Sequence, residues 1–134
     1  MAEGFLRYKW RQMKRDDLIV SSMGIHGITD SPPTEFAQDV CKENGFDISS
    51  HIARPLVGKE LLTADLILCM EPVHKRFVQV FFPWRRYRVA LLGAWPDKET
   101  RKSAIQDPMG GSYKKYQKVF SLIKEHIERI IPLL

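Results

Sequence analysis

The apolar positions in the first 45 residues predict a helix, a buried strand and a second helix. These three segments span residues 2–14, 18–20 and 34–44. In the first segment Leu6, Trp10 and Met13 recur at helical spacing, whereas the second is a short branched apolar run. The inner face of the third is formed by Phe36, Ala37, Val40 and Cys41. Gly45 follows it, at the position where a helix often ends in a left-handed cap.

The middle of the chain repeats this alternation of helix and strand. A short helical turn opens at Gly58, and apolar runs predict strands at residues 66–70 and 89–92. Between these strands, a helix begins at Pro72 and ends before Pro83. The apolar stripe of this helix consists of Phe77, Val78 and Phe81.

The last predicted helix begins after Ser112, whose hydroxyl can cap its first turn. Its apolar positions are spaced by three and four residues and comprise Tyr116, Val119, Phe120, Ile123, Ile127 and Ile130. Strands that alternate with helices in this way predict an α/β fold, with a parallel sheet covered by helices on both faces.

Composition fits a globular protein of one domain, residues 1–134, because 44% of the residues are apolar and 28% are charged. The apolar runs are too short to cross a bilayer, and charges interrupt the N-terminus where a secretory signal would be apolar. Cys41 and Cys69 match no zinc or redox spacing. We therefore expect no metal, no membrane partner and a cytoplasmic location, with Cys69 as a packed core thiol.

The net charge of +5 is a moderate excess that matches no nucleic-acid-binding motif. A solvated basic face explains it better than a nucleic-acid partner, which we do not expect. Three other clusters follow strands or stand in long loops, where sites are usually built. They are Ser21, Ser22 and Gly24, residues 50–54, and residues 106–111. Each is weak evidence alone, since an Asp-Pro pair such as Asp107-Pro108 is more often a turn than a catalytic acid.

Together, and in this order, these segments resemble the low-molecular-weight protein tyrosine phosphatases over essentially the whole chain. The matching segments are Met1-Ala2-Glu3-Gly4, residues 20–24, Pro32-Pro33, residues 45–54, residues 61–70 with Glu71 and His74, and Asp107-Pro108 with Gly110-Gly111. The resemblance implies a flavodoxin-like, three-layer α/β fold. The chain would then begin just after the family's phosphate-binding loop and lack its first strand.

The resemblance also implies the chemistry. In the family, a cysteine thiolate attacks the phosphorus of a phosphotyrosine or another aryl phosphate, and an arginine with backbone N–H groups binds the phosphoryl oxygens. An aspartic acid protonates the leaving phenolate and later activates water. Asp107 matches this acid, Ser22 and His51 match residues that brace the phosphate loop, and Ile28 and Met109 stand where an aromatic wall is common. The family reaction requires no cofactor.

The chain departs from the family pattern at the nucleophile. A cysteine must be followed, after five residues, by an arginine, but position 47 is Asp47 and position 75 is Lys75. We therefore expect the chain alone to be inactive. One explanation is that Met1 is an internal methionine of a complete phosphatase. A second is a non-catalytic module that forms a homo-oligomer or binds another chain through exposed strand edges. A third, the arsenate reductase branch of the fold, needs relay cysteines that Cys41 and Cys69 are not spaced to supply.

Overall fold

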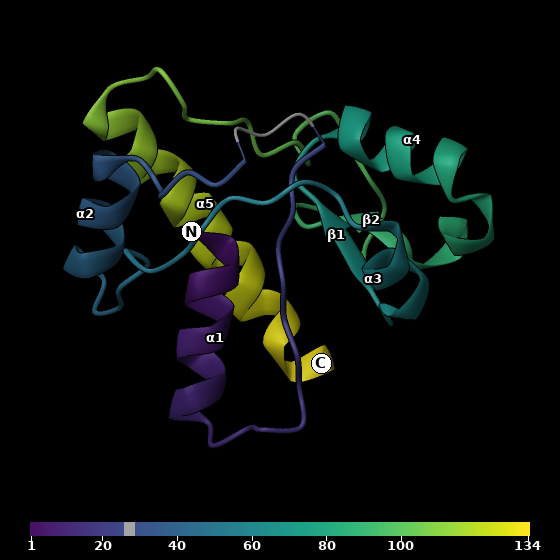
Figure 1. The fold of residues 1–134 in the computed structure, drawn as a ribbon, viewed down its shortest axis with the longest axis horizontal. Coiled ribbons are helices and arrows are strands. Elements are labelled where there is room, and N and C mark those ends of the chain that lie inside the picture. Colours follow the sequence, from purple (N-terminus) through teal and green to yellow (C-terminus); the bar gives the residue numbers. More distant parts are fainter. Residues whose placement is uncertain (26–28) are drawn as a thin grey trace. The chain divides into compact units, whose positions relative to one another are not determined.

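In the computed structural model, helices and short strands alternate along residues 1–25 and 29–134, which are the residues that the structure describes, while the side chains of residues 85–87 lie outside that description (Figure 1). The elements are α1 (Ala2–Gln12), α2 (Glu35–Glu43), α3 (Gly58–Thr63), β1 (Ile67–Cys69), α4 (Pro72–Phe81), the 3-10 helix η1 (Pro83–Arg88), β2 (Val89–Leu91), α5 (Tyr113–Ile130) and the 3-10 helix η2 (Ile131–Leu133).

The chain divides into two compact units, each with its own core. Unit 1 comprises Met1–Leu56 and Pro108–Lys124, and unit 2 comprises Val57–Asp107 and Glu125–Leu134. Helix α5 therefore contributes its first turns to unit 1 and its last turns to unit 2. The expectation of a single domain over residues 1–134 stays a prediction.

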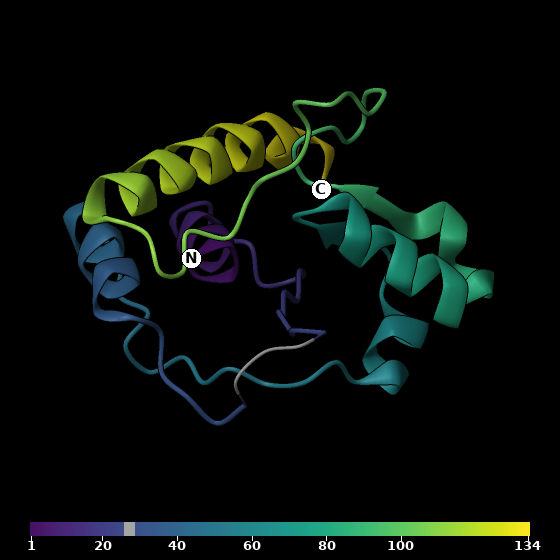
Figure 2. The ribbon, with the colours of Figure 1, turned by 90° about the horizontal axis from the view of Figure 1, so that it is seen from above.

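Unit 1 is built around aromatic rings from α1, the segment after α2, and α5. The ring of Phe5 lies 5.7 Å from that of Phe46 and 5.6 Å from that of Phe120, measured between centroids. Figures 1 and 2 both show α1 lying beside α5. Gly4 allows α1 to come close to the same segment, because a Cβ at this position would overlap the side chain of Ile48. The core of unit 1 is thus aromatic and tightly packed.

Helix α2 begins and ends as its sequence predicts. The Thr34 side chain accepts a hydrogen bond from the backbone N–H of Ala37 at 3.3 Å, and Gly45 adopts a φ of +85° after the last turn. Ala37, Val40 and Cys41 are buried as predicted. The placement of Phe36 on the inner face was wrong: it is exposed, at the border of the buried face, and its ring meets the rings of Tyr113 and Tyr116 edge-on.

Unit 2 contains a parallel sheet of β1 and β2, in which Ile67 pairs with Val89 and Cys69 with Leu91. Helix α4 packs against both strands, and Figure 2 shows it beside them. On α5, the guanidinium of Arg129 donates hydrogen bonds to the carbonyls of Leu92 (3.1 Å) and Trp95 (2.9 Å), just beyond β2. The predicted α/β class, with a parallel sheet flanked by helices, is confirmed.

The structure also confirms the helix predicted after Ser112, which is α5. The Ser112 hydroxyl accepts a hydrogen bond from the N–H of Lys115 at 3.3 Å, and all six predicted apolar positions are buried. By contrast, Met13 lies beyond the end of α1 and is exposed, and Phe81 faces outward from α4 with 61% of its surface exposed. A helical stripe shows which residues share a face, but it does not show whether that face is covered.

The predicted strand at residues 18–20 was wrong. This segment is irregular, and the side chain of Ile19 is 95% exposed. A strand exists through backbone hydrogen bonds to a neighbouring strand, and β1 and β2 pair only with each other in the described part of the chain. The nearest β-type pairing is a single parallel bridge between Gly24 and Pro55. Apolar character alone therefore does not make this segment a strand.

Candidate functional site

Two of the predicted site residues meet at a buried carboxylate in the first turn of α1. The Ser22 hydroxyl donates a hydrogen bond of 2.5 Å to Oε2 of Glu3, and Nδ1 of His51 lies 3.8 Å from the same oxygen. The other oxygen of Glu3 forms an ion pair with Arg7 at 2.7 Å. Only 10% of the Glu3 side chain is exposed. We call Glu3, Arg7, Ser22 and His51 the Glu3 cluster.

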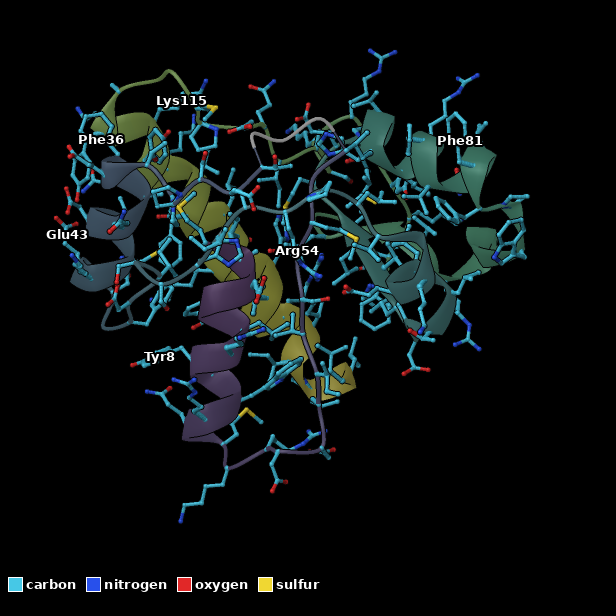
Figure 3. All side chains as sticks on the ribbon, in the orientation of Figure 1. Tyr8, Phe36, Glu43, Arg54, Phe81 and Lys115 are labelled. Atoms are coloured by element: carbon cyan, nitrogen blue, oxygen red, sulfur yellow. The ribbon has the colours of Figure 1, made fainter. Side chains whose placement is uncertain are left out.

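Hydrogen bonds to backbone carbonyls hold the segments that carry Ser22 and His51 in place. Arg7 donates to the carbonyl of Val20 (3.0 Å), and the Nε of Arg54 donates to the carbonyl of Ser22 (3.0 Å). The N–H of Gly24 donates to the carbonyl of Arg54 at 3.0 Å, within the parallel bridge. Figure 3 labels Arg54 on this segment. The two segments are thereby tied together where they meet α1.

Sequence reasoning missed Glu3 and Arg7. An acidic residue in the first turn of a helix is common, because it interacts favourably with the helix dipole, so Glu3 carried no distinct signal. The (i, i+4) spacing of Glu3 and Arg7 indicates an ion pair. It does not indicate that residues 19 and 48 positions further along the chain would converge on the same carboxylate.

Asp107 belongs to unit 2, at the end of a loop that is anchored beside the sheet. The N–H of Ile105 donates to the carbonyl of Met70, just after β1, at 2.8 Å, and Ile105 itself is buried. Earlier in the loop, the chain at Gly93 passes so close to the carbonyl of Ser103 that a Cβ would overlap it. The Asp107 carboxylate is exposed and follows this anchored segment by two residues.

The structure describes only one of the two residues that were predicted to line the wall of the substrate pocket. Met109 lies in unit 1 in a turn that starts at Pro108, and its side chain is exposed. Gly110 follows it with a φ of +76°, a conformation that glycine adopts without strain. Ile28 lies outside the described residues.

Neither cysteine is poised to act as a nucleophile. Both thiols are free and buried. Burial raises the pKa of Cys41 to about 11 and that of Cys69 to about 11, because an apolar environment disfavours the thiolate. The prediction that Cys69 is a core residue is confirmed. An open hollow of about 400 Å³, lined by Phe36, Asp39, Lys42, Glu43 and Tyr113, contains none of the predicted site residues.

The fold and the order of these motifs agree with comparisons to known proteins. The family model described as "Low molecular weight phosphotyrosine protein phosphatase" matches residues 1–133. The low molecular weight protein-tyrosine-phosphatase Ptp of Acinetobacter johnsonii is 33% identical over 81% of this chain and 69% of its own length. The chain belongs to the low molecular weight phosphotyrosine protein phosphatase family.

Solved structures extend the similarity to the backbone. The low molecular weight protein tyrosine phosphatase from T. tengcongensis aligns with 99% of this chain and 88% of its own, with a TM-score of 0.90 and 28% identity. Wzb from Vibrio vulnificus, in complex with benzylphosphonate, aligns over the same shares with a TM-score of 0.85 and 26% identity. The arrangement of helices and strands is therefore that of the family.

Proposed function

We propose that this chain supplies the acid and the bracing residues of an aryl phosphate monoesterase site, and that the 134 residues alone do not hydrolyse phosphate esters. The observation that carries the proposal is the Glu3 cluster, in which Ser22 and His51 share one buried carboxylate at the start of α1. In the family, residues at the positions of Ser22 and His51 brace the loop that binds phosphate. The cluster can hold that loop at the start of the helix.

The expected reaction divides into two steps with Asp107 in both. A cysteine thiolate attacks phosphorus while the carboxylic acid of Asp107 gives its proton to the departing phenolate. The resulting Asp107 carboxylate then takes a proton from the water that attacks the cysteinyl phosphate, which releases phosphate. An exposed carboxylate on an anchored, Pro-containing loop suits this role, and the exposed apolar side chain of Met109 suits contact with an aromatic ring.

The residues that the chain contains support the proposed inactivity of the isolated chain. Neither cysteine precedes an arginine at the required distance, and both thiols have a pKa of about 11, so they are protonated at neutral pH. The nucleophile and the phosphate-binding groups of such a site act as a unit, and the rate falls steeply when any member is lost. Without a nucleophile no covalent intermediate forms, so Asp107 has no leaving phenolate to protonate.

Aryl phosphate monoesters are the substrate class that we propose for a completed site. Wzb of Vibrio vulnificus is solved with benzylphosphonate, in which a phosphonate is joined to an aromatic ring through one carbon, and this supports a phosphotyrosine-like substrate. Two free, buried cysteines support a reducing compartment, so we propose the cytoplasm as its location. The family model extends across both units, which supports a single domain.

The test compares two proteins in hydrolysis of phenyl phosphate and p-nitrophenyl phosphate. One is the 134-residue chain, and the other adds the family's first strand and a Cys-x5-Arg loop before Met1. We expect no turnover by the first and turnover by the second. In the longer protein, Asp107→Asn should lower kcat by about 10²–10⁴-fold. The loss should be larger for phenyl phosphate, because its phenolate is the poorer leaving group and needs the proton more.

Asp97→Asn is the matched control, because Asp97 is also an exposed aspartate of unit 2 and lies in the same region of the chain. It should leave kcat unchanged. If the 134-residue chain hydrolyses a phosphorylated phenol and Asp107→Ala abolishes this activity, the proposal that the chain lacks its nucleophile is wrong. Equal rates for Asp107→Asn and the parent longer protein would contradict the role of Asp107.

A second candidate function is supported by the exposed segment 18–20. Ile19 is 95% exposed in an irregular segment whose composition favours a strand. Such a segment can add to a strand of another chain, including a second copy, and serve as a non-catalytic interaction module. Size-exclusion chromatography with light scattering would test self-association. A dimer that Ile19→Lys dissociates would support this function, and a stable monomer would count against the homo-oligomer.

A further inference from the structure

The turn that carries Met109 is covered by a lysine from the start of α5. The backbone N–H of Gly111 donates to the carbonyl of Pro108 at 2.9 Å, which closes the turn. A Cβ at Gly111 would overlap Cδ of Lys115, so the aliphatic part of the Lys115 side chain lies against this glycine. Figure 3 labels Lys115 near the start of α5. Lys115 is therefore held beside the turn while it remains exposed.

This position brings Lys115 close to the residue that we expect to contact the aromatic ring of the substrate. Met109 and Lys115 both belong to unit 1, and Met109 is 58% exposed. Gly111, which Lys115 covers, follows Met109 by two residues, and two residues of chain span at most about 7 Å. When the ring of a phosphotyrosine lies against Met109, a neighbouring residue of the same peptide comes within reach of the Lys115 ammonium group.

Like every helix in the described part of the chain, α5 is not both long and apolar enough to cross a membrane, and its outward side begins with lysines. Lys114 and Lys115 lie in its first turn, which contains no acidic residue, and Lys118 follows one turn later. The start of a helix carries a partial positive charge, so lysines there are unfavourable. Lys115 and Lys118 also repel each other, since they are three positions apart. Residues that break a local rule in this way are candidates for a functional role.

The positive charge of Lys115 is not neutralised by the described residues. Within residues 1–25 and 29–134, no ion pair involves Lys115. Asp39 and Glu43 of α2 line the open hollow together with Tyr113, and Lys115 does not line it. Positions 113 and 115 are about 200° apart around a helix, so Tyr113 and Lys115 face different sides of α5. The ammonium group of Lys115 is therefore available to an anionic group of a partner molecule.

We propose that Lys115 is a specificity-determining residue, which selects phosphotyrosine peptides that carry an acidic residue next to the phosphotyrosine. The inference rests on the proposed function, because it requires a completed phosphatase site. The Lys115 ammonium group pairs with the peptide carboxylate at the rim of the site, where Met109 contacts the ring. An exposed ion pair of this kind contributes about a two- to fivefold preference, and salt weakens it.

The test uses the longer protein, which adds the family's first strand and a Cys-x5-Arg loop before Met1. Its substrates are two phosphotyrosine peptides of equal length, one with glutamate and one with glutamine on both sides of the phosphotyrosine. Release of phosphate gives kcat/KM for each peptide. We expect kcat/KM to be about two- to fivefold higher for the glutamate peptide, and we expect the difference to shrink as salt is raised.

Substitutions of Lys115 should change this preference in a defined direction. Lys115→Gln should make the two peptides equal, and Lys115→Glu should favour the glutamine peptide over the glutamate peptide, because like charges repel. Both variants remove positive charge from the start of a helix, so they should fold, as circular dichroism would show. Lys115→Arg should keep the preference of the parent protein.

Lys124→Gln is the matched control, because it removes one exposed lysine from the same helix and the same unit. Position 124 lies about 13 Å further along the axis than position 115 and about 180° around it. This variant should keep the preference for the glutamate peptide. If Lys124→Gln and Lys115→Gln reduce the preference equally, the preference comes from overall charge and the inference is wrong.

Two further results would overturn the inference and leave the proposed function standing. One is equal kcat/KM for the two peptides in a longer protein that hydrolyses p-nitrophenyl phosphate. The other is a Lys115→Gln variant that lowers kcat/KM for both peptides by the same factor, since Lys115 would then act on the site as a whole. If the longer protein does not hydrolyse p-nitrophenyl phosphate, the proposed function is wrong and this inference is wrong with it.

Discussion

Removal of the Glu3 carboxylate is the perturbation that most directly tests the Glu3 cluster. Glu3→Ala deletes the acceptor of the 2.5 Å hydrogen bond from Ser22 and the partner of Arg7. A hydrogen bond to a buried charged group contributes about 1.5–3 kcal/mol. The ion pair adds at most about 1 kcal/mol, because half of the Arg7 side chain is exposed. We expect a loss of about 1.5–4 kcal/mol in the free energy of unfolding.

Thermal unfolding followed by circular dichroism measures this loss. For a chain of this length the entropy of unfolding is about 0.28 kcal/mol/K, so the expected loss lowers Tm by about 5–14 °C. Asp17→Ala is the matched control, because it removes a carboxylate of unit 1 whose ion pair with Arg15 is exposed, and it should lower Tm far less. The reasoning is refuted if Glu3→Ala lowers Tm no more than Asp17→Ala does.

Three further predictions test the cores and the buried titrating groups. Gly93→Ala should destabilise the protein by about 2–4 kcal/mol in urea unfolding, because its methyl group overlaps a backbone carbonyl, whereas Gly110→Ala meets no atom and should cost about 1–2 kcal/mol through its positive φ alone. At pH 8, iodoacetamide should alkylate Cys41 and Cys69 at least about 200-fold more slowly than free cysteine, since a pKa of about 11 leaves little thiolate; mass spectrometry would detect any faster reaction. Burial, assisted by a neighbouring guanidinium, lowers the pKa of His126, so the unfolded chain takes up a proton at a higher pH than the folded chain. Stability should fall as the pH drops from about 6.5 toward the folded pKa, and His126→Gln should reduce that slope in urea unfolding between about pH 7 and 5.

The sequence was most informative where local rules decide the structure. The Thr34 cap, the left-handed Gly45 and the six buried positions of α5 depend on neighbours within a few residues, and the structure contains all of them. Each of these features follows from helix geometry and from the ends of helices, which are properties of a short segment.

Features that depend on residues far apart in the sequence could not be predicted in the same way. A strand at 18–20 requires a neighbouring strand, and nothing in its own composition reports whether one is present. Phe36 and Phe81 have the apolar character of core residues, but which side of a helix is covered depends on other elements. Glu3 became interpretable only when Ser22 and His51 were seen to meet it. The predicted role of Asp107 came from resemblance and is the part that kinetics must test.

Membership of α5 in both units has a consequence for how the protein denatures. The helix runs without interruption from Tyr113 to Ile130, and the boundary between the units falls at Lys124, inside it. Opening of the helix at that boundary breaks backbone hydrogen bonds on which both cores depend. Unfolding of one core should therefore promote unfolding of the other. Hydrogen exchange should therefore report similar opening free energies for the buried amides of Phe120 and Ile127, the signature of one cooperative foldon.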